Sequence, residues 1–194
     1  LTTIGPHPTE HLFNAEVLAR IDSGSLLINA GRGAVIDNAA LLQLLESGSP
    51  LRVALDVWEE EPSISLPLMD RVALATPHIA GYSVEGKARG TEMLAEAFKR
   101  LNHGAVNTTA ELPKSVSRLA AETLSELLLA SYDVAADDLR MREALNNSSD
   151  VALTFDLLRK QYPERHEFSC YAFSGNAEEG QPELKAQALK LGFR

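Results

Sequence analysis

The first half of the chain alternates between short apolar runs and longer segments in which apolar residues recur at helical spacing. The short runs cover residues 25–30 (SLLINA), 52–57 (RVALDV) and 72–77 (VALATP). Continuous apolar runs of this length are typical of strands that are buried on both faces of a parallel sheet. The pattern therefore predicts three parallel strands in the first 80 residues.

Helical signals lie next to these runs. Residues 37–48 begin with Asp37, a favourable N-cap, and end with Gly48, a residue that commonly stops a helix. Residues 14–24 repeat this layout with an asparagine and a glycine. The link over residues 57–72 contains two prolines, so we expect an irregular crossover there rather than a regular helix. The alternation of helix and strand predicts an α/β fold.

The second half has a different character. Residues 81–104 predict a long amphipathic helix that ends at Gly104, and residues 105–115 read as a linker. The remaining predicted elements are a strongly helical region over 115–145, a helix over 149–163 with Asp150 as a possible cap, a strand within 166–175 and a last helix over 181–193. We therefore expect two domains, residues 1–105 and a small α+β domain over residues 106–194.

Composition narrows the class of protein. The formal net charge of −9 argues against a nucleic-acid partner, and the single cysteine, Cys170, excludes an intrachain disulfide and suits a structural role. No apolar run has the length of a membrane span, and the N-terminus lacks the layout of a signal peptide. These features predict a cytoplasmic protein without membrane partners. Because the chain opens without methionine, on residues that read like the inside of a protein, we expect a fragment.

Unusual polar residues follow each predicted strand. Arg32 follows the first, Asp56 and Glu61 follow the second, and His78 follows the third. The carboxyl ends of parallel strands meet at one edge of a sheet, where ligands bind. There a histidine can take a proton from a hydroxyl, a carboxylate can orient the imidazole, and an arginine can grip a substrate carboxylate with two hydrogen bonds. This combination suits oxidation of a 2-hydroxy acid with hydride transfer to a nicotinamide.

Each of these residues also has an ordinary interpretation. A single arginine or histidine after a strand is most often a surface residue, and three consecutive glutamates usually form a solvated turn. The coincidence of all three residue types at successive strand ends, with glycines beside two of them, favours a site.

Three segments carry a family resemblance: LLINAGRGAVID (26–37), ALDVWEEEP (54–62) and TPHIAGY (76–82). They resemble the signatures of the NAD-dependent D-2-hydroxyacid dehydrogenases. The resemblance implies part of a doubly wound, Rossmann-like parallel sheet, NAD as the cofactor and a small hydroxy acid as the substrate. HIAGYSVEGKARGT (78–91) and the C-terminal segments resemble one member of that family, which acts on a phosphorylated substrate and forms a homodimer through an additional C-terminal domain.

The resemblance also implies roles for individual residues. The catalytic glutamate of the family directly precedes the proline, which selects Glu61 and leaves Glu59 and Glu60 as solvated residues, while Trp58 is expected to pack rather than react. The implied catalytic residues are Arg32, Glu61 and His78; the implied NAD contacts are Ala30, Gly31, Arg32, Asp56 and Gly81; the implied substrate contacts are Tyr82 and Arg32; and no metal ligand is implied.

Three departures from the family pattern limit what this chain is expected to do alone. The Gly-x-Gly-x-x-Gly loop that cradles the pyrophosphate is absent, and so are the acidic residue that binds the adenosine ribose and the N-terminal substrate-binding lobe. We therefore expect only part of an NAD site and an inactive fragment. The alternatives are another dehydrogenase of the family, of the phosphoglycerate or glycerate type, a non-catalytic NAD-sensing protein like the corepressors that keep this fold, and a dimerisation module.

Overall fold

The structure, a computed structural model, describes residues 8–102, 117–173 and 182–194. The chain divides into two compact units, each built from two separate stretches of sequence. The first unit comprises Leu1–Ala80 and Val134–Tyr162, and the second comprises Gly81–Asp133 and Pro163–Arg194. Each unit is described by itself below.

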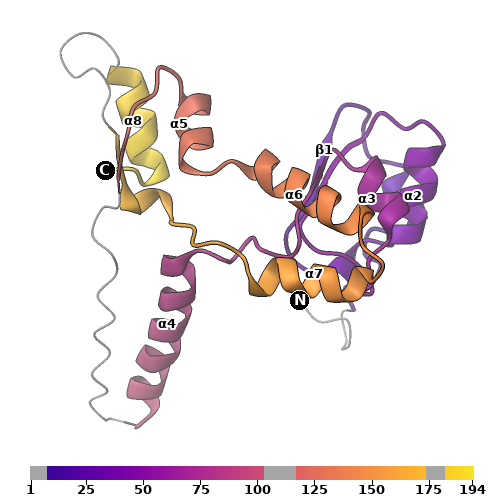
Figure 1. Cartoon of the computed structure of the whole chain (residues 1–194), viewed down its shortest axis with the longest axis horizontal. Helices are drawn as coiled ribbons and strands as arrows, with labels where there is room; N and C mark the ends of the chain where they lie inside the picture. The colour runs from indigo at the N-terminus through magenta and orange to yellow at the C-terminus, as the bar shows by residue number, and fades with distance from the viewer. Residues whose placement is uncertain (1–7, 103–116, 174–181) are drawn as a thin grey trace. The chain divides into compact units, whose positions relative to one another are not determined.

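The first unit contains a three-stranded parallel sheet in the order β1-β2-β3 (Figure 1). The strands are β1 (Leu26–Asn29), β2 (Arg52–Leu55) and β3 (Leu74–Ala75). In register, Leu26 lies opposite Arg52 and Ala54 lies opposite Leu74. The prediction of three parallel strands is confirmed, and their carboxyl ends share one edge of the sheet.

Short helices connect these strands. They are α1 (Ala15–Leu18), α2 (Asn38–Glu46) and α3 (Leu66–Arg71), with a 3-10 turn, η1, at Gly33–Val35. Asp37 caps α2 as predicted, because its Oδ1 accepts a hydrogen bond from the Ala40 backbone N–H at 2.8 Å. The expectation of an irregular link between β2 and β3 was wrong in its second half. Ser65 caps α3, and Pro67 lies in the first turn, where a proline costs no helical hydrogen bond.

Two helices from the second half of the sequence complete the core of this unit. They are α6 (Val134–Asn146) and α7 (Val151–Lys160). Met141, Leu145 and Phe155 are fully buried in the same hydrophobic cluster as the sheet residues Val53 and Leu55. Segments that are more than 60 residues apart in the sequence (about a third of the chain) therefore fold together.

Polar contacts fasten α6 to the strand that leads to His78. The Asp138 Oδ1 accepts a hydrogen bond from the Ala75 backbone N–H at 2.6 Å. Arg142 donates to the carbonyl oxygens of Met69 and of Val72, the latter at 3.0 Å, and pairs with Asp138. These bonds satisfy backbone groups at the end of α3 and on β3. The domain boundary expected near residue 105 stays a prediction. In the structure, α6 and α7 lie beyond this boundary in the sequence but pack against the sheet.

The sheet is buried on one face only within the described part of the chain. Val53 and Leu55 of β2 are 1% exposed, whereas Leu26 and Ile28 of β1 are 52% and 63% exposed. Successive side chains of a strand point to opposite faces, so these exposed residues share the other face. The apolar runs predicted burial on both faces, and the structure leaves the second face of β1 open.

The second unit combines helices with a two-stranded parallel sheet. Its elements are α4 (Val84–Asn102), β4 (Ser117–Leu119), α5 (Leu124–Ser131), the 3-10 turn η2 (Phe168–Cys170), β5 (Tyr171–Phe173) and α8 (Pro182–Leu191). Leu127, Ala188 and Phe193 form its buried centre.

The predicted elements of this half are partly corrected. The helical region expected over 115–145 is divided into β4, α5 and α6, because a capping box of Thr123 and Glu126 starts a new helix and α5 ends at an extended Tyr132. The helix over 149–163, with Asp150 as its cap, the strand and the last helix are confirmed. The predicted end of the long helix at Gly104 and the linker over 105–115 lie outside the described residues.

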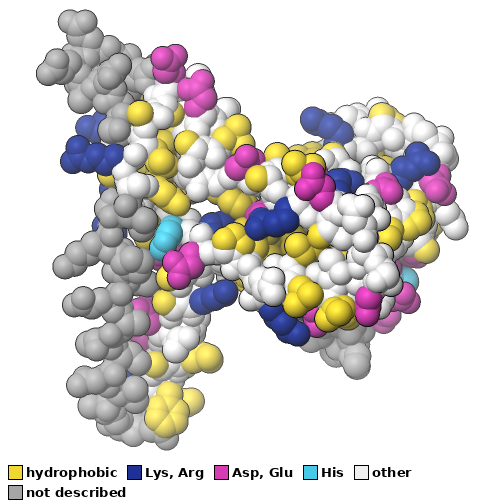
Figure 2. All heavy atoms as spheres, viewed as in Figure 1, with side chains coloured by type: hydrophobic (Ala, Val, Ile, Leu, Met, Phe, Trp, Pro, Cys, Tyr) yellow, Lys and Arg dark blue, Asp and Glu magenta, His cyan; other side chains and the backbone are white. Residues whose placement is uncertain are grey.

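Apolar side chains stay exposed on α4. Met93, Leu94, Phe98 and Leu101 are between 56% and 79% exposed. Figure 2 shows hydrophobic side chains toward the C-terminal end of this helix. The charged residues of α4 make it too polar to cross a membrane. Within the described part of the chain, no helix combines the length and the apolar character that a membrane span requires.

Candidate active site

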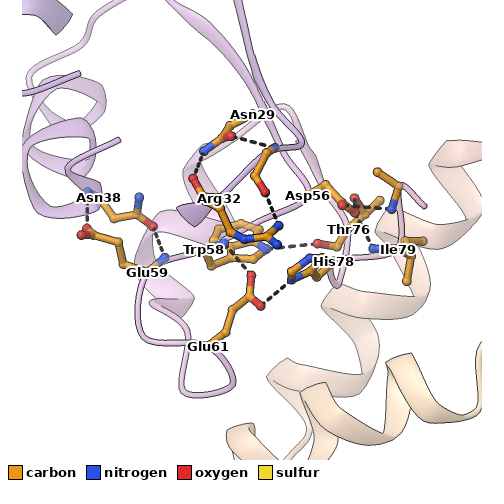
Figure 3. Close-up of polar contacts among 12 residues, drawn as sticks. Asn29, Arg32, Asn38, Asp56, Trp58, Glu59, Glu61, Thr76, His78 and Ile79 are labelled. Atoms are coloured by element: carbon orange, nitrogen blue, oxygen red, sulfur yellow. Dashed lines mark hydrogen bonds and ion pairs between the residues drawn. The ribbon is translucent and has the colours of Figure 1, made fainter. Parts of the chain in front are cut away.

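One hydrogen bond joins the loops that follow β2 and β3. The Nδ1 atom of His78 lies 2.7 Å from Oε2 of Glu61 (Figure 3). The other oxygen of this carboxylate, Oε1, accepts a hydrogen bond from the Trp58 backbone N–H at 2.8 Å. Both side chains are partly buried, with 29% of His78 and 19% of Glu61 exposed. The acid next to the proline is thus the one that contacts the histidine.

The conformation of His78 depends on Asp56. His78 has a φ of +56°, a left-handed conformation that costs a non-glycine residue roughly 1–3 kcal/mol. The Asp56 carboxylate accepts hydrogen bonds from the backbone N–H groups of Ile79 and Ala80 at 2.8 and 3.0 Å, and its backbone carbonyl accepts one from His78 N–H at 2.7 Å. These bonds hold the turn that presents the imidazole. Asp56 itself is buried.

Thr76 and Trp58 support the same turn. The Thr76 hydroxyl donates to Asp56 Oδ1 at 2.7 Å, and the Trp58 indole N–H donates to the Thr76 carbonyl oxygen at 3.0 Å. Trp58 is only 3% exposed and belongs to the hydrophobic core. The expectation that Trp58 packs agrees with this burial, and its indole nitrogen also links the β2 loop to the end of β3.

The loop after β1 is shaped by Asn29. The Asn29 side chain accepts from the Gly31 backbone N–H at 3.1 Å and donates to the Arg32 carbonyl oxygen at 2.9 Å. Arg32 is exposed, and its Nη1 donates to the Gly31 carbonyl oxygen at 2.8 Å. Figure 3 draws Arg32 in the same region as Glu61 and His78, beyond the ends of the strands. The neighbouring Ala30 is exposed.

Gly33 brings this loop against the loop of Glu61. A Cβ atom on Gly33 would lie 1.9 Å from the Trp58 carbonyl oxygen, which no side chain can occupy. Glycine is therefore required where the two backbones touch. This requirement links the position of Arg32 to that of Trp58.

Gly81 and Tyr82 belong to the second unit. Gly81 is exposed, and no heavy atom lies within 4 Å of the position of an added Cβ. Tyr82 is half-buried, and the Lys87 ammonium lies 4.3 Å from its ring centroid. The structure thus places Arg32, Asp56, Glu61 and His78 in one unit. The roles inferred for these residues, and for Gly81 and Tyr82, stay predictions.

We expected Glu59 to be solvated, but its carboxylate is held by two partners. Its Oε2 accepts a hydrogen bond from the Asn38 backbone N–H at 2.7 Å, and its Oε1 lies 2.6 Å from Nε2 of His11. Glu60, in contrast, is exposed as expected. The neighbours in the EEE run therefore have different surroundings.

Potential metal ligands come together in two clusters of the described residues. These are Glu85, His166 and Cys170 in the second unit and His11, Asp37 and Glu59 in the first, with ligand atoms within 4.8 Å of one another. In each cluster a carboxylate already pairs with the imidazole, at 2.8 Å for Glu85 and 2.6 Å for Glu59. Burial and the hydrogen bond with Glu85 raise the pKa of the Cys170 thiol, which favours the protonated form. In both clusters, hydrogen bonds among the side chains explain why these residues lie close together.

The sequence pattern missed the residues that support the site. Asn29, Asn38 and Thr76 are buried polar residues whose side chains bond to loops carrying Arg32, Glu61 and His78. Asn29 and Thr76 could have been selected from the sequence, because each is a polar residue at the end of an apolar run. Nothing in the sequence pattern selects Asn38 or His11, because their partners are far away in the sequence.

Comparison with known proteins places these residues in a family context. Residues 2–80 match the model of the D-isomer specific 2-hydroxyacid dehydrogenase NAD-binding domain, and residues 108–192 match a domain of unknown function. The chain is 42% identical over its whole length to an erythronate-4-phosphate dehydrogenase of Saccharophagus degradans and covers 52% of that protein. It is 47% identical over 87% of its length to the enzyme of the same name from Edwardsiella ictaluri and covers 46% of that protein. The chain thus spans about half the length of the curated relatives it matches.

Two solved structures are among those similar to part of this chain. One is a D-lactate dehydrogenase of Aquifex aeolicus in complex with NAD and lactic acid, with a TM-score of 0.40, 28% identity and coverage of 50% of this chain and 34% of that one. Another is a glyoxylate/hydroxypyruvate reductase of Sinorhizobium meliloti, with a TM-score of 0.44, 31% identity and coverage of 57% and 36%.

Proposed function

Since residues 2–80 belong to the NAD-binding domain family of the D-isomer specific 2-hydroxyacid dehydrogenases, we propose that the chain is the catalytic and C-terminal part of an NAD-dependent erythronate-4-phosphate dehydrogenase. The complete enzyme oxidises 4-phospho-D-erythronate at C2 to the 2-oxo acid, a step in the formation of pyridoxal phosphate. The observation that carries this proposal is the 2.7 Å contact between His78 and Glu61, in a chain that places Arg32 after the neighbouring strand.

His78 is the proposed acid–base residue. With Nδ1–H donated to Glu61, the Nε2 atom carries a lone pair and accepts the proton of the C2 hydroxyl. Bound NAD would supply the acceptor for the hydride from C2. The proton and the hydride together are the two hydrogens lost from the alcohol. The imidazolium that results is stabilised by the adjacent carboxylate of Glu61.

Arg32 is the proposed anchor for the substrate carboxylate. Its guanidinium is exposed, and its planar fork matches a carboxylate with two parallel hydrogen bonds. The proposed position of Tyr82 near the substrate rests on the family pattern alone.

The described residues fit one end of NAD. Ala30 is exposed, and Gly31 has no side chain, so backbone is accessible beside the end of β1. Asp56 uses its carboxylate to shape the His78 turn, and a carboxylate oxygen can accept a second hydrogen bond from the carboxamide of the nicotinamide. For the pyrophosphate, the sequence offers no Gly-x-Gly-x-x-Gly loop. These residues would hold only the nicotinamide end.

We also propose a cytoplasmic homodimer in which residues 106–194 supply the subunit contact. The apolar Leu129 of α5 and Leu189 of α8 are 55% and 54% exposed, which supports an association surface. The match of residues 108–192 to a separate family model supports a distinct module there.

The test of the activity is a substrate assay on the complete gene product that contains this chain. We expect NAD reduction with 4-phospho-D-erythronate at a kcat/KM at least about a hundredfold above that with 3-phosphoglycerate or glycerate, since only the matched substrate places the phosphate, carboxylate and C2 hydroxyl together. Preference for 3-phosphoglycerate would assign the chain to another member of the family. NAD binding without turnover of any of these acids would support a sensor and overturn the proposal.

A further inference from the structure

A set of hydrogen bonds centred on Glu59 ties the loop of Glu61 to the loop of Arg32. The Glu59 carboxylate accepts from the Asn38 backbone N–H at 2.7 Å, and the Glu59 backbone N–H donates to the Asn38 side-chain oxygen at 3.2 Å. This reciprocal pair joins the β2–α3 loop to the first turn of α2 (Figure 3). The two loops are therefore connected by bonds as well as by the close approach of Gly33.

Asn38 is a fixed partner. It is 7% exposed, and its side-chain amide donates to the Ile36 carbonyl oxygen at 2.8 Å. The N-terminus of a helix carries a partial positive charge, so the carboxylate of Glu59 is favoured beside the first N–H of α2. Both the side chain and the backbone of Glu59 are thus held against one helix end.

His11 holds the second oxygen of the same carboxylate. Its Nε2 lies 2.6 Å from Glu59 Oε1, and its backbone N–H donates to the Ala34 carbonyl oxygen at 2.7 Å, beside the Arg32 loop. The hydrogen bond with Glu59 raises the pKa of His11 above its usual value, and the charge of Asp37, 3.7 Å from Nδ1, adds to this effect. The interaction therefore gains the strength of an ion pair as His11 takes up a proton.

The loop needs such an anchor. Between Glu59 and Glu61, the residue Glu60 has a φ of +57°, a conformation that L-residues rarely adopt. Glu61 in turn is held by the backbone N–H of Trp58, directly before Glu59. If Glu59 were released, the strained turn could relax, and the Glu61 carboxylate would lose both Trp58 and His78.

We propose that Glu59 is a positioning residue: by holding its loop to Asn38 and His11, it keeps the Glu61 carboxylate on the His78 imidazole. This inference rests on the proposed function, in which Glu61 and His78 form the acid–base pair. In this role Glu59 acts through Glu61.

The test compares Glu59→Ala with Glu60→Ala in the complete enzyme, with 4-phospho-D-erythronate and NAD. We expect Glu59→Ala to lower kcat about tenfold with less than a twofold change in the KM for NAD, a loss of the same kind as in Glu61→Gln. Glu59→Gln, which keeps an acceptor for Asn38, should lose less than about threefold. Glu60→Ala is the matched control and should behave like the wild type.

A second readout is independent of turnover. We expect the ring proton between His78 and Glu61 to give a downfield proton resonance, which is assigned by its loss in Glu61→Gln. This resonance should disappear in Glu59→Ala and stay in Glu60→Ala. If Glu59→Ala keeps both this resonance and the wild-type kcat, the positioning role is overturned. If the wild type oxidises none of the hydroxy acids, the proposed function fails, and the resonance alone decides whether Glu59 positions Glu61. Should Glu59→Ala not fold, Asn38→Ala, which removes the side-chain acceptor of the Glu59 backbone N–H, takes its place.

Discussion

Single residues in the EEE run show how the same side chain acquires different tasks. Glu61 contacts His78, Glu59 bonds to α2 and His11, and Glu60 is exposed. All three are glutamates in one turn, so composition does not separate them. The distinction comes from the backbone, which turns at Glu60 and sends the side chains to different partners.

Replacement of Glu61 tests the first of these tasks. In Glu61→Gln the negative charge beside the imidazole is lost, so the side chain no longer stabilises the charge that forms on the ring during proton transfer. We expect kcat to fall by about tenfold or more. Steady-state rates provide the measurement, with Glu60→Gln as the control. A loss of kcat in Glu60→Gln and none in Glu61→Gln would mean that the other acid serves the histidine.

Arg32 provides a second test at this scale. A lysine keeps the charge but lacks the bidentate fork, so Arg32→Lys should lose on the order of 2 kcal/mol of transition-state binding, or roughly thirtyfold in kcat/KM. The effect should be larger for the hydroxy acid than for NAD. Kinetics with 4-phospho-D-erythronate decide, and a loss below about threefold would remove Arg32 from the proposed carboxylate site.

At the scale of secondary-structure elements, the site is made by contacts between loops. The loops after β1 and β2 touch at Gly33 and Trp58, and the loops after β2 and β3 are joined through Asp56. The strands set the edge of the sheet where the loops emerge, and the loop contacts set the final positions of the side chains. A change in one contact should therefore disturb more than one functional residue.

Gly33→Ala tests this dependence. The added methyl group would lie 1.9 Å from the Trp58 carbonyl oxygen, so the loops must separate, and we expect a loss of about 2–3 kcal/mol in the free energy of unfolding. Urea denaturation gives this quantity. The control is Gly90→Ala in α4, where no atom lies within 4 Å of the new Cβ and alanine should be neutral or stabilising. Equal stability of the two variants would show that the loops do not touch as described.

At the scale of the whole molecule, each unit joins distant segments through an acidic side chain. In the first unit, Asp138 of α6 bonds to the Ala75 backbone N–H. In the second, the Glu85 carboxylate of α4 accepts from His166 and from the Glu167 backbone N–H, both at 2.8 Å. Such bonds connect stretches that are separated by more than 60 residues (about a third of the chain) and so determine which segments fold together.

The stability of the second unit should depend on pH through Glu85. Burial alone would raise the pKa of Glu85, but hydrogen bonds from His166, the Glu167 backbone N–H and Cys170 outweigh it and lower the pKa from 4.5 to about 2. A lowered pKa means that the carboxylate stabilises the fold above pH 4.5 and that this contribution, on the order of 3 kcal/mol, is lost as the pH falls toward 2.

Urea unfolding of the chain at several pH values measures this contribution. Glu85→Gln should reduce stability at neutral pH and flatten the decline in stability between pH 4.5 and 2. Glu164→Gln, an exposed acid of the same unit, should keep the wild-type pH dependence. An unchanged acid decline in Glu85→Gln would contradict the role of this carboxylate.

The proposed dimer belongs to the same scale. Sedimentation equilibrium of residues 1–194 at micromolar concentration should report a dimer, because α5 and α8 leave apolar side chains exposed. Combined substitution of Leu129 and Leu189 by glutamate should give a monomer, while the same change at the exposed Leu26 of β1, in the other unit, should keep the dimer. A monomeric wild type, or a dimer broken only by Leu26→Glu, would exclude α5 and α8 as the contact.

The sequence by itself determined the local features of this protein. Apolar runs predicted the three parallel strands, Asp37 and Asp150 predicted helix starts, and the motifs around Arg32, Glu61 and His78 predicted which residues follow which strand. These features depend on neighbours within a few residues, and they are encoded by spacing and by capping chemistry. The choice of Glu61 over its two neighbours came from the family resemblance, in which the catalytic glutamate directly precedes a proline.

Only the tertiary structure decided which distant segments meet. The sequence did not reveal that α6 and α7 complete the core of the sheet, that His11 and Asn38 hold Glu59, or that Gly33 touches the Trp58 backbone. Each of these contacts joins residues more than 20 positions apart (over five turns of helix). Local propensity carries no information about such pairs, because their free energy arises from burial and from hydrogen bonds that exist only once the chain has folded.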